Sequence, residues 1–318
     1  MRSRRGVALL AALWLVVAIA TVALQFSIEA RERRTVGILT SERGIQRAAA
    51  LGALAFTQAR LEQALRVTPT GTNVQRLRSS DPWMDVDSVY SGPVLVDSMQ
   101  VDVVARDLGE RLNINRANET QLQTFFSFLL GDYSKATQLA QAIMDWRDVD
   151  SMPRPSGAER DAYIKAGMLA LPTNTPFREI EELQHVMGMT PEIYSTVSPY
   201  LTTHGTAAVN LNTAPVAVLR ALPGMTDATL NRILQLRSQG RRISSIAEVF
   251  PAMTGGRRLP GQVASPAALA QLNAQVAVNT TEVELTIIAR VGPQAPPTRL
   301  IAVVARLGSN ATVRTKLW

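Results

Sequence analysis

Cysteine is absent from this chain of 318 residues, and histidine occurs only twice. Without cysteine the protein cannot form disulfides, thiolate zinc sites, iron–sulfur clusters or a thiol nucleophile. A chain of this length buries a hydrophobic core without disulfides, so the absence is compatible with a periplasmic location. His185 and His204 stand in unrelated contexts, and no phosphate-binding loop, dinucleotide fingerprint, zinc-protease motif or nucleophile elbow occurs. The sequence therefore predicts a protein that is not an enzyme.

A second absence marks the N-terminus, where no ionisable side chain occurs from Val7 to Ile28. At about 1.5 Å per residue, this helical run is long enough to cross the hydrocarbon core of a bilayer. The arginines that precede it place the first residues in the cytoplasm and the bulk of the chain in the periplasm. Helical spacing continues to Leu65. We therefore predict a single-pass inner-membrane protein with one helix over 7–65, of which 7–28 is transmembrane.

The junction Arg5-Gly6-Val7 resembles a prepilin peptidase site, with cleavage between Gly6 and Val7 and N-methylation of Val7. Cleavage there removes the leader 1–6 and keeps the apolar helix. An uncleaved signal anchor shows the same order of charge and apolar run, and is the alternative. Pilin-like proteins usually carry Glu at the fifth mature position, where this chain has Ala11. Since a carboxylate in lipid needs a partner on a neighbouring subunit, its absence suits a subunit placed first, at a tip.

Beyond the helix the sequence predicts a small sheet. Strand-like runs cover 94–96 and 100–105, and 110–115 is expected to pair with them; C-terminal strands are expected at 282–291, 299–307 and 311–318. Helical periodicity fills the interval. The expected fold class is α+β: a pilin-like fold with a long N-terminal transmembrane helix, a small antiparallel β-sheet and a large inserted α-helical domain. The expected domains are the leader 1–6, the helix 7–65, the first sheet part 66–114, the inserted helical domain 115–275 and the C-terminal strands 276–318.

The inserted region contains a weak internal repeat. Leu112-Asn113-Ile114-Asn115 matches Val209-Asn210-Leu211-Asn212, and each is followed by two helices joined by a short turn. The second asparagine of each pair is expected to cap the helix that it precedes. The pattern predicts SAM-like or helix-hairpin-helix repeats.

Helix-hairpin-helix repeats raise the alternative of a membrane-anchored DNA-binding or DNA-uptake protein. In DNA-binding hairpins the turn reads close to L-P-G-x-G, because glycine lets backbone N–H groups approach phosphate. Here Thr226 replaces the second glycine, Asp227 follows it, and the other turn carries Asp132. The net charge of +7 is dispersed along the chain. We therefore expect no nucleic acid partner, although four arginines remain candidates for phosphate contacts: Arg232, Arg237, Arg241 and Arg242.

Carboxylates gather in the segment 145–161. Asp148 and Asp150, two residues apart, are expected to converge on one cation, and Glu159 to close the loop. Hard oxygen ligands of this kind suit calcium. The segment is not an EF-hand, and a solvated acidic loop without an ion is the alternative. Asp145 and Asp161 are further candidate ligands.

Taken in order, these segments resemble the minor pseudopilin K family of type II secretion systems. The resemblance rests on R-G-V-A-L-L, L-N-I-N, D-W-R-D-V-D with a following G-A-E, E-E-L-Q-H-V-M-G-M-T, and V-N-L-N-T-A-P. It implies assembly with minor pseudopilins I and J at the pseudopilus tip, where the subunit initiates or caps assembly for export of folded proteins across the outer membrane. It also implies calcium in the acidic loop, on Asp148, Asp150 and Glu159. A related type IV pilus tip subunit is the alternative.

Overall fold

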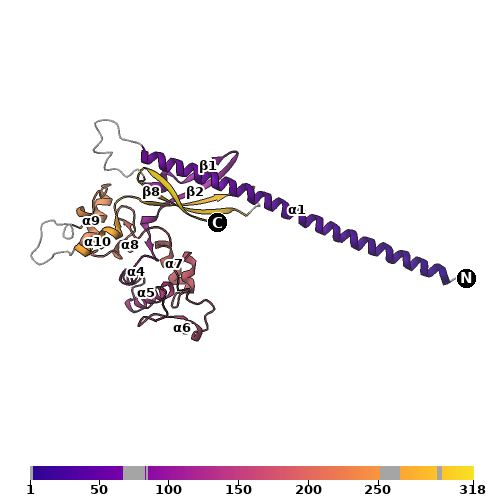
Figure 1. Ribbon diagram of the computed structural model, residues 1–318, viewed down its shortest axis with the longest axis horizontal. Helices are drawn as coiled ribbons and strands as arrows, with labels where there is room; N and C mark the ends of the chain where they lie inside the picture. Colours follow the sequence, from indigo (N-terminus) through magenta and orange to yellow (C-terminus); the bar gives the residue numbers. More distant parts are fainter. Residues whose placement is uncertain (1–2, 67–82, 84, 251–265, 292–295) are drawn as a thin grey trace, which may run out of the picture.

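The computed structural model describes residues 3–66, 83, 85–250, 266–291 and 296–318, and the break expected after the long helix lies mainly outside them. Helix α1 (Ser3–Arg66) is a single unbroken helix of 64 residues, which confirms the predicted long helix. Figure 1 shows its N-terminal half projecting far from the rest of the chain. Large apolar side chains between Leu13 and Ile28 are 48–72% exposed. Among the described residues, α1 alone is long and apolar enough to cross a membrane.

Five strands form one antiparallel sheet in the order β1-β2-β7-β8-β9. The C-terminal half of α1 covers one face of this sheet, and Ala50, Ala53 and Leu61 are buried against it. Gly52 allows a close approach, because a Cβ atom there would lie 2.8 Å from Val96 Cγ1. The predicted C-terminal strands are confirmed. The strands are β1 (Gly92–Val96), β2 (Met99–Asp107), β7 (Glu282–Ala289), β8 (Thr298–Leu307) and β9 (Asn310–Leu317).

The chain between β2 and β7 is mainly helical and has a hydrophobic core of its own. In Figure 1 this region lies on the side of the sheet away from α1. Two short parallel pairs, β3 (Leu112–Asn113) with β4 (Leu201–Thr202) and β5 (Val209–Asn210) with β6 (Val276–Ala277), tie its ends together. Its helices are α4 (Glu119–Leu130), α5 (Tyr133–Arg147), α6 (Arg160–Lys165), α7 (Pro191–Val197), α8 (Val216–Arg220), α9 (Asp227–Ser238) and α10 (Pro266–Gln275), and α3 (Val86–Val89) precedes β1. The 3₁₀ turns are η1 (Leu108–Glu110), η2 (Ile180–His185), η3 (Ser198–Tyr200) and η4 (Ile246–Glu248).

The expected pairing of 110–115 with the first two strands is wrong. The Asp107 side chain accepts a hydrogen bond from the Gly109 N–H and caps η1, which turns the chain out of the sheet. Strand β3 then pairs with β4 and not with β1 or β2. Turn chemistry at the end of β2 therefore overrides the extended pattern that follows it.

The internal repeat is carried by matching hydrogen bonds. The Asn115 side chain donates to the carbonyls of Phe177 and Thr203, and it accepts the Phe177 N–H. Asn212 repeats this pattern, so each second asparagine joins two distant backbone segments. The partners of Asn212 are the Ile243 and Val278 carbonyls and the Ile243 N–H.

These bonds also explain a wrong prediction, since Asn115 and Asn212 do not cap helices. The N-cap of α4 is Asn118, which accepts from the Gln121 N–H at 2.9 Å, while the Gln121 side chain accepts from the Asn118 N–H. Helix α8 begins after Pro215. The asparagine amides are used instead for long-range bonds. The finer description as SAM-like or helix-hairpin-helix repeats stays a prediction.

Two buried carboxylates lie where the chain leaves and re-enters the sheet. Asp107, at the end of β2, is 2% exposed, and Glu282, at the start of β7, is 4% exposed. A buried polar group that loses its hydrogen bond costs about 1–3 kcal/mol. The hydrogen bonds of Asp107 and Glu282 therefore hold the helical region against the sheet. Asp107 accepts from Asn210 Nδ2 (2.8 Å), Thr213 Oγ1 (2.7 Å) and Thr280 Oγ1 (3.2 Å), and Glu282 accepts from the Thr206 N–H (2.6 Å) and pairs with Arg314 (3.4 Å).

Candidate metal centre

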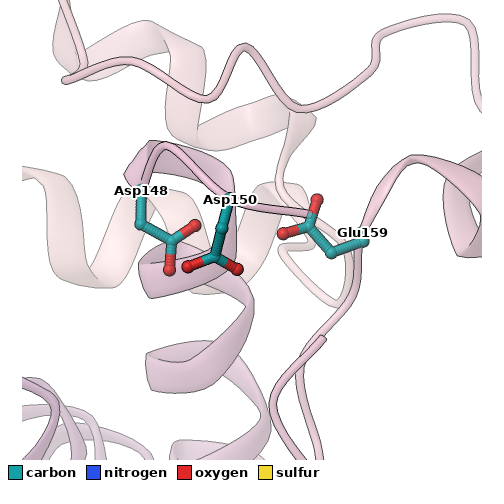
Figure 2. A group of neighbouring side chains, drawn as sticks. All are labelled: Asp148, Asp150 and Glu159. Carbon is teal, nitrogen blue, oxygen red and sulfur yellow. The ribbon is translucent and has the colours of Figure 1, made fainter. Parts of the chain in front are cut away.

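Three carboxylates converge between α5 and α6, as the sequence predicts. Asp148 is the C-cap of α5, Asp150 follows in the loop, and Glu159 is the N-cap residue of α6. Each offers an oxygen, and these oxygens lie within 4.8 Å of one another. Figure 2 shows the three side chains turned toward a common point. The helix ends therefore bring together residues that lie up to eleven positions apart in the chain.

Glu159 is the most constrained member of the group. It is 6% exposed, and neither of its carboxylate oxygens accepts a well-formed hydrogen bond among the described residues; the nearby Arg160 N–H only lowers its pKa against the stronger effects that raise it. Burial, with the negative charges of Asp145, Asp148 and Asp150, raises the pKa of Glu159. One oxygen of Asp148, Oδ1, is also buried without a donor. Buried carboxylate oxygens of this kind need a proton or a cation.

The loop that carries Asp150 is held by its backbone. The Asp150 side chain accepts from the Met152 N–H at 2.9 Å, and its carbonyl accepts from Asn174 Nδ2 at 2.5 Å. The Asn174 N–H donates in turn to the Trp146 carbonyl at the end of α5. Asn174 adopts a positive φ of 50°, which asparagine tolerates better than most residues. The ring of Trp146 stacks on Phe177, so the loop rests on the core of the helical region.

The two further candidates lie outside this group. Asp145 is fully buried and pairs with Arg154, and Asp161 is exposed in the first turn of α6. Neither the contacts of Arg154 nor the Asn174 bridge could be predicted from the sequence, because both depend on how the loop folds back. The grouped oxygens are hard donors that suit a divalent cation such as calcium or magnesium. An ion held by these oxygens would link the end of α5 to the start of α6.

The hairpin turns are closed by their own side chains. Asp132 accepts from the Lys135 N–H and Thr226 from the Thr229 N–H, so each helix N-terminus is already capped. These are the N–H groups that a phosphate would need. All four candidate arginines make contacts within the chain: Arg232 with Gln235, Arg237 with the Leu211 and Ala214 carbonyls, Arg241 with Glu248, and Arg242 with the Val278 carbonyl and Asn279.

Arg237 and its counterpart in the first repeat, Arg147, have the same structural role. Each side chain donates to backbone carbonyls at the start of its own repeat, Arg147 to Ala117 and Arg237 to Ala214. Burial lowers the pKa of each to about 10, so both stay charged at neutral pH. Arg237 is therefore a structural residue and is not free to contact phosphate.

The family model described as type II secretion system (T2SS), protein K, matches residues 101–206. Over this segment the chain is similar to the protein K family of type II secretion systems. The matched segment runs from β2 through the acidic loop to the end of the first repeat. The resemblance expected from the sequence is confirmed.

Three relatives are each named type II secretion system protein K. The protein of Klebsiella pneumoniae is 32% identical, and the alignment covers 33% of this chain and 34% of that protein. The protein of Dickeya chrysanthemi is 35% identical, and the alignment covers 33% of this chain and 31% of that protein. These alignments thus span about a third of the length of those proteins. The protein of Pectobacterium carotovorum subsp. carotovorum is 27% identical over 74% of this chain and 76% of its own.

The fold has a match among solved structures. A chain in the crystal structure of the GspK-GspI-GspJ complex from enterotoxigenic Escherichia coli superposes with a TM-score of 0.62 at 16% identity. The match covers 89% of this chain and 98% of that chain. It shows that the mixed fold, with its N-terminal helix and antiparallel sheet, is shared.

The raised pKa of Glu159 predicts a pH-dependent effect of Glu159→Gln in metal-free buffer. A folded pKa above the ordinary value of 4.5 stabilises the fold in acid, and this stability is lost as the pH rises through the folded pKa. In chelator the variant should therefore melt a few degrees above the parent at about pH 7.5, and the difference should vanish near pH 4. Thermal unfolding followed by circular dichroism measures this.

Glu181→Gln is the control, because it removes the same charge at an exposed position in η2. Its melting temperature should stay close to that of the parent at both pH values. A Glu159→Gln variant that melts below the parent at neutral pH in chelator would contradict the buried, donor-free position of this carboxylate.

Proposed function

We propose that the protein is a minor pseudopilin at the tip of the type II secretion pseudopilus. It is anchored in the inner membrane by α1, its bulk lies in the periplasm, and it initiates or caps the pseudopilus during export of folded proteins. Its role is structural and not catalytic. The observation that carries the proposal is the division of α1 into two parts with opposite surroundings.

The N-terminal part of α1 is apolar and projects away from the folded domain. Its side chains from Leu13 to Ile28 are exposed, so this part needs lipid or other helices around it. The C-terminal part instead buries residues such as Ala50 and Leu54 against the sheet. A helix of this kind can be held in the bilayer first and packed beside similar helices in a fibre afterwards, without any change in the folded domain.

The proposed position and partners are supported by the structural match and by the residue at position 11. The structural match belongs to a complex with GspI and GspJ, and we propose that this chain likewise assembles with minor pseudopilins I and J. Ala11 stands at the fifth mature position, so the subunit has no carboxylate with which to dock on an earlier neighbour. The helical region adds bulk beside the sheet, which suits a subunit above which no other stacks.

For the acidic group we propose calcium, held by Asp148, Asp150 and Glu159. Calcium accepts carboxylate, carbonyl and water ligands in flexible geometry, which fits a loop that offers three carboxylates. The donor-free oxygens of Glu159 and Asp148 are the support for this assignment. The ion would neutralise them and order the loop between α5 and α6.

The proposal predicts maturation by a prepilin peptidase. We expect the mature chain, purified from membranes of cells that contain the peptidase, to begin at N-methylated Val7. Gly6→Leu should block this cut, because a bulky side chain replaces the residue that leaves the backbone open. Mass spectrometry of the N-terminal peptide measures both outcomes.

Gly37→Leu is the matched control, since it makes the same change in the same helix where a Cβ has no neighbour within 4 Å. This variant should be cut like the parent. A parent chain that still begins at Met1, or one cut near Thr35, would reject the assignment.

The calcium assignment predicts a ligand-dependent gain in stability. Saturating calcium should raise the melting temperature of the detergent-solubilised chain, because an ion at about 100 times its Kd adds about 2.7 kcal/mol. Asp150→Asn and Glu159→Gln should lose most of this gain, whereas Asp161→Asn, outside the group, should keep it. An equal response in all four proteins would contradict the ligand set.

A further inference from the structure

A cleft of about 530 Å³ lies where α3 and η1 meet the second repeat. This volume falls within the range of small-molecule sites, about 300–1,000 Å³. Carboxylates from α3 and η1 form one wall, the acidic wall, and arginines at the end of α9 and just after it form the other, the arginine wall. The members are Asp85, Asp87 and Glu110 on the acidic wall, and Arg237, Arg241 and Arg242 on the arginine wall.

The buried part of the lining is polar but already satisfied. Asp107 accepts hydrogen bonds there from Asn210, Thr213 and Thr280. A buried network whose hydrogen bonds are all made is rigid, so it holds the two walls at a fixed separation. What the cleft can bind therefore depends on the charges of the walls.

The acidic wall gathers negative charge. Asp85 is exposed and is the N-cap residue of α3, but its side chain makes no capping hydrogen bond. Glu110 is half-buried, and Arg111 Nε lies 3.8 Å from its Oε1. Burial, and after it the charge of Asp87, raises the pKa of Glu110 in spite of Arg111. This wall therefore favours a cation.

The arginine wall contains a cation without a carboxylate partner. Among the described residues, the Arg237 side chain donates only to backbone carbonyls, which carry no full charge. In the first repeat the equivalent residue, Arg147, is followed by Asp148, whose negative charge raises the pKa of Arg147. In the second repeat Ser238 stands at that place. Because charges removed from water are normally paired, Arg237 favours an anion in the cleft.

Arg241 and Arg242 bring further N–H donors to the arginine wall. Gly240 follows the end of α9 with a positive φ of 64°, and the chain turns there so that both arginines line the cleft. The Arg241 side chain is 57% exposed, and its Nη2 lies 3.4 Å from Glu248 Oε1. A guanidinium has five N–H donors, so Arg241 can bind a second carboxylate as well. Among the described residues, neither Arg237 nor Arg241 forms an ion pair with the acidic wall, so the two walls do not neutralise each other.

We propose that this cleft binds a ligand with a guanidino or amino group at one end and a carboxylate at the other. The cationic group binds beside Asp87 and Glu110. The carboxylate binds to Arg241 and Arg242, and Arg237 adds fixed positive charge behind them. A ligand with charge of one sign alone is repelled by one of the walls, so the cleft selects for both charges. This chemistry occurs in a free basic amino acid and in a basic residue at the C-terminus of a peptide.

The test is calorimetric titration of the full chain in detergent with L-arginine and, separately, with the peptide Gly-Gly-Arg. We expect at least one of these probes to bind saturably. Asp87→Asn and Arg241→Gln should each weaken this binding about tenfold, because each removes a charge-assisted contact. Both positions are exposed, so the melting temperatures of these variants should stay close to that of the parent.

Two controls test the selectivity for both charges. Agmatine, which is arginine without the carboxylate, should bind more weakly than L-arginine and should lose nothing further in Arg241→Gln. Arg232→Gln removes the same charge at an exposed position of α9 outside the cleft and should bind both probes like the parent.

The two probes separate the two sources of the ligand. Binding of L-arginine that both cleft variants weaken supports recognition of a free amino acid, whereas the same result with Gly-Gly-Arg alone supports recognition of a peptide end. No saturable binding of either probe up to millimolar concentrations would overturn the proposal. Binding that either cleft variant leaves unchanged, or that Arg232→Gln weakens equally, would also overturn it.

Discussion

The rest of the structure depends on α1, a single unbroken helix whose two halves have different surroundings. The first half exposes apolar side chains that water does not tolerate, and the second half presents small residues that let the sheet pack closely. Gly52 against Val96 shows how tight that packing is. Because the helix is continuous, the position of the head relative to the membrane is set by the rod to which it is fixed. The sheet is fixed to α1, and the helical region is fixed to the sheet, so α1 sets the position of both.

Within the part of the chain that the structure describes, the helical region has a core separate from that of the sheet, and polar contacts join the two. Its hydrophobic residues form one cluster, and those between α1 and the sheet form another. Asp107 and Glu282 hold the two crossings, and each is satisfied by groups from the helical side. Since unmade buried hydrogen bonds are costly, such contacts specify orientation as well as stability. The acidic loop, at the far end of α5, is then carried at a fixed place on the subunit.

Much of the fold and of the acidic group could be predicted from the spacing of residues along the sequence. The apolar run, the alternating strands of the C-terminus and the pairing of Asp148, Asp150 and Glu159 were all predictable, because each rests on spacing along the chain. Long-range polar partners were not. Asn115 and Asn212 were predicted to cap helices, but their side chains bond distant backbone segments instead. One carbonyl that Asn115 contacts is 62 residues away, and those that Asn212 contacts are 31 and 66 residues away. Arg154 likewise gives no sign in the sequence that it neutralises Asp145, since only the folded loop brings them together.

The central claim is that α1 holds the folded head outside the cytoplasm while the chain stays in the membrane. The absence of cysteine allows a direct measurement with one introduced thiol, Leu169→Cys, at a fully exposed position of the helical region. Intact spheroplasts are treated with a membrane-impermeant maleimide, and membranes are then separated from soluble protein. The account predicts a labelled chain that sediments with the membranes. Labelling only after lysis, or a labelled chain in the soluble fraction, would contradict it.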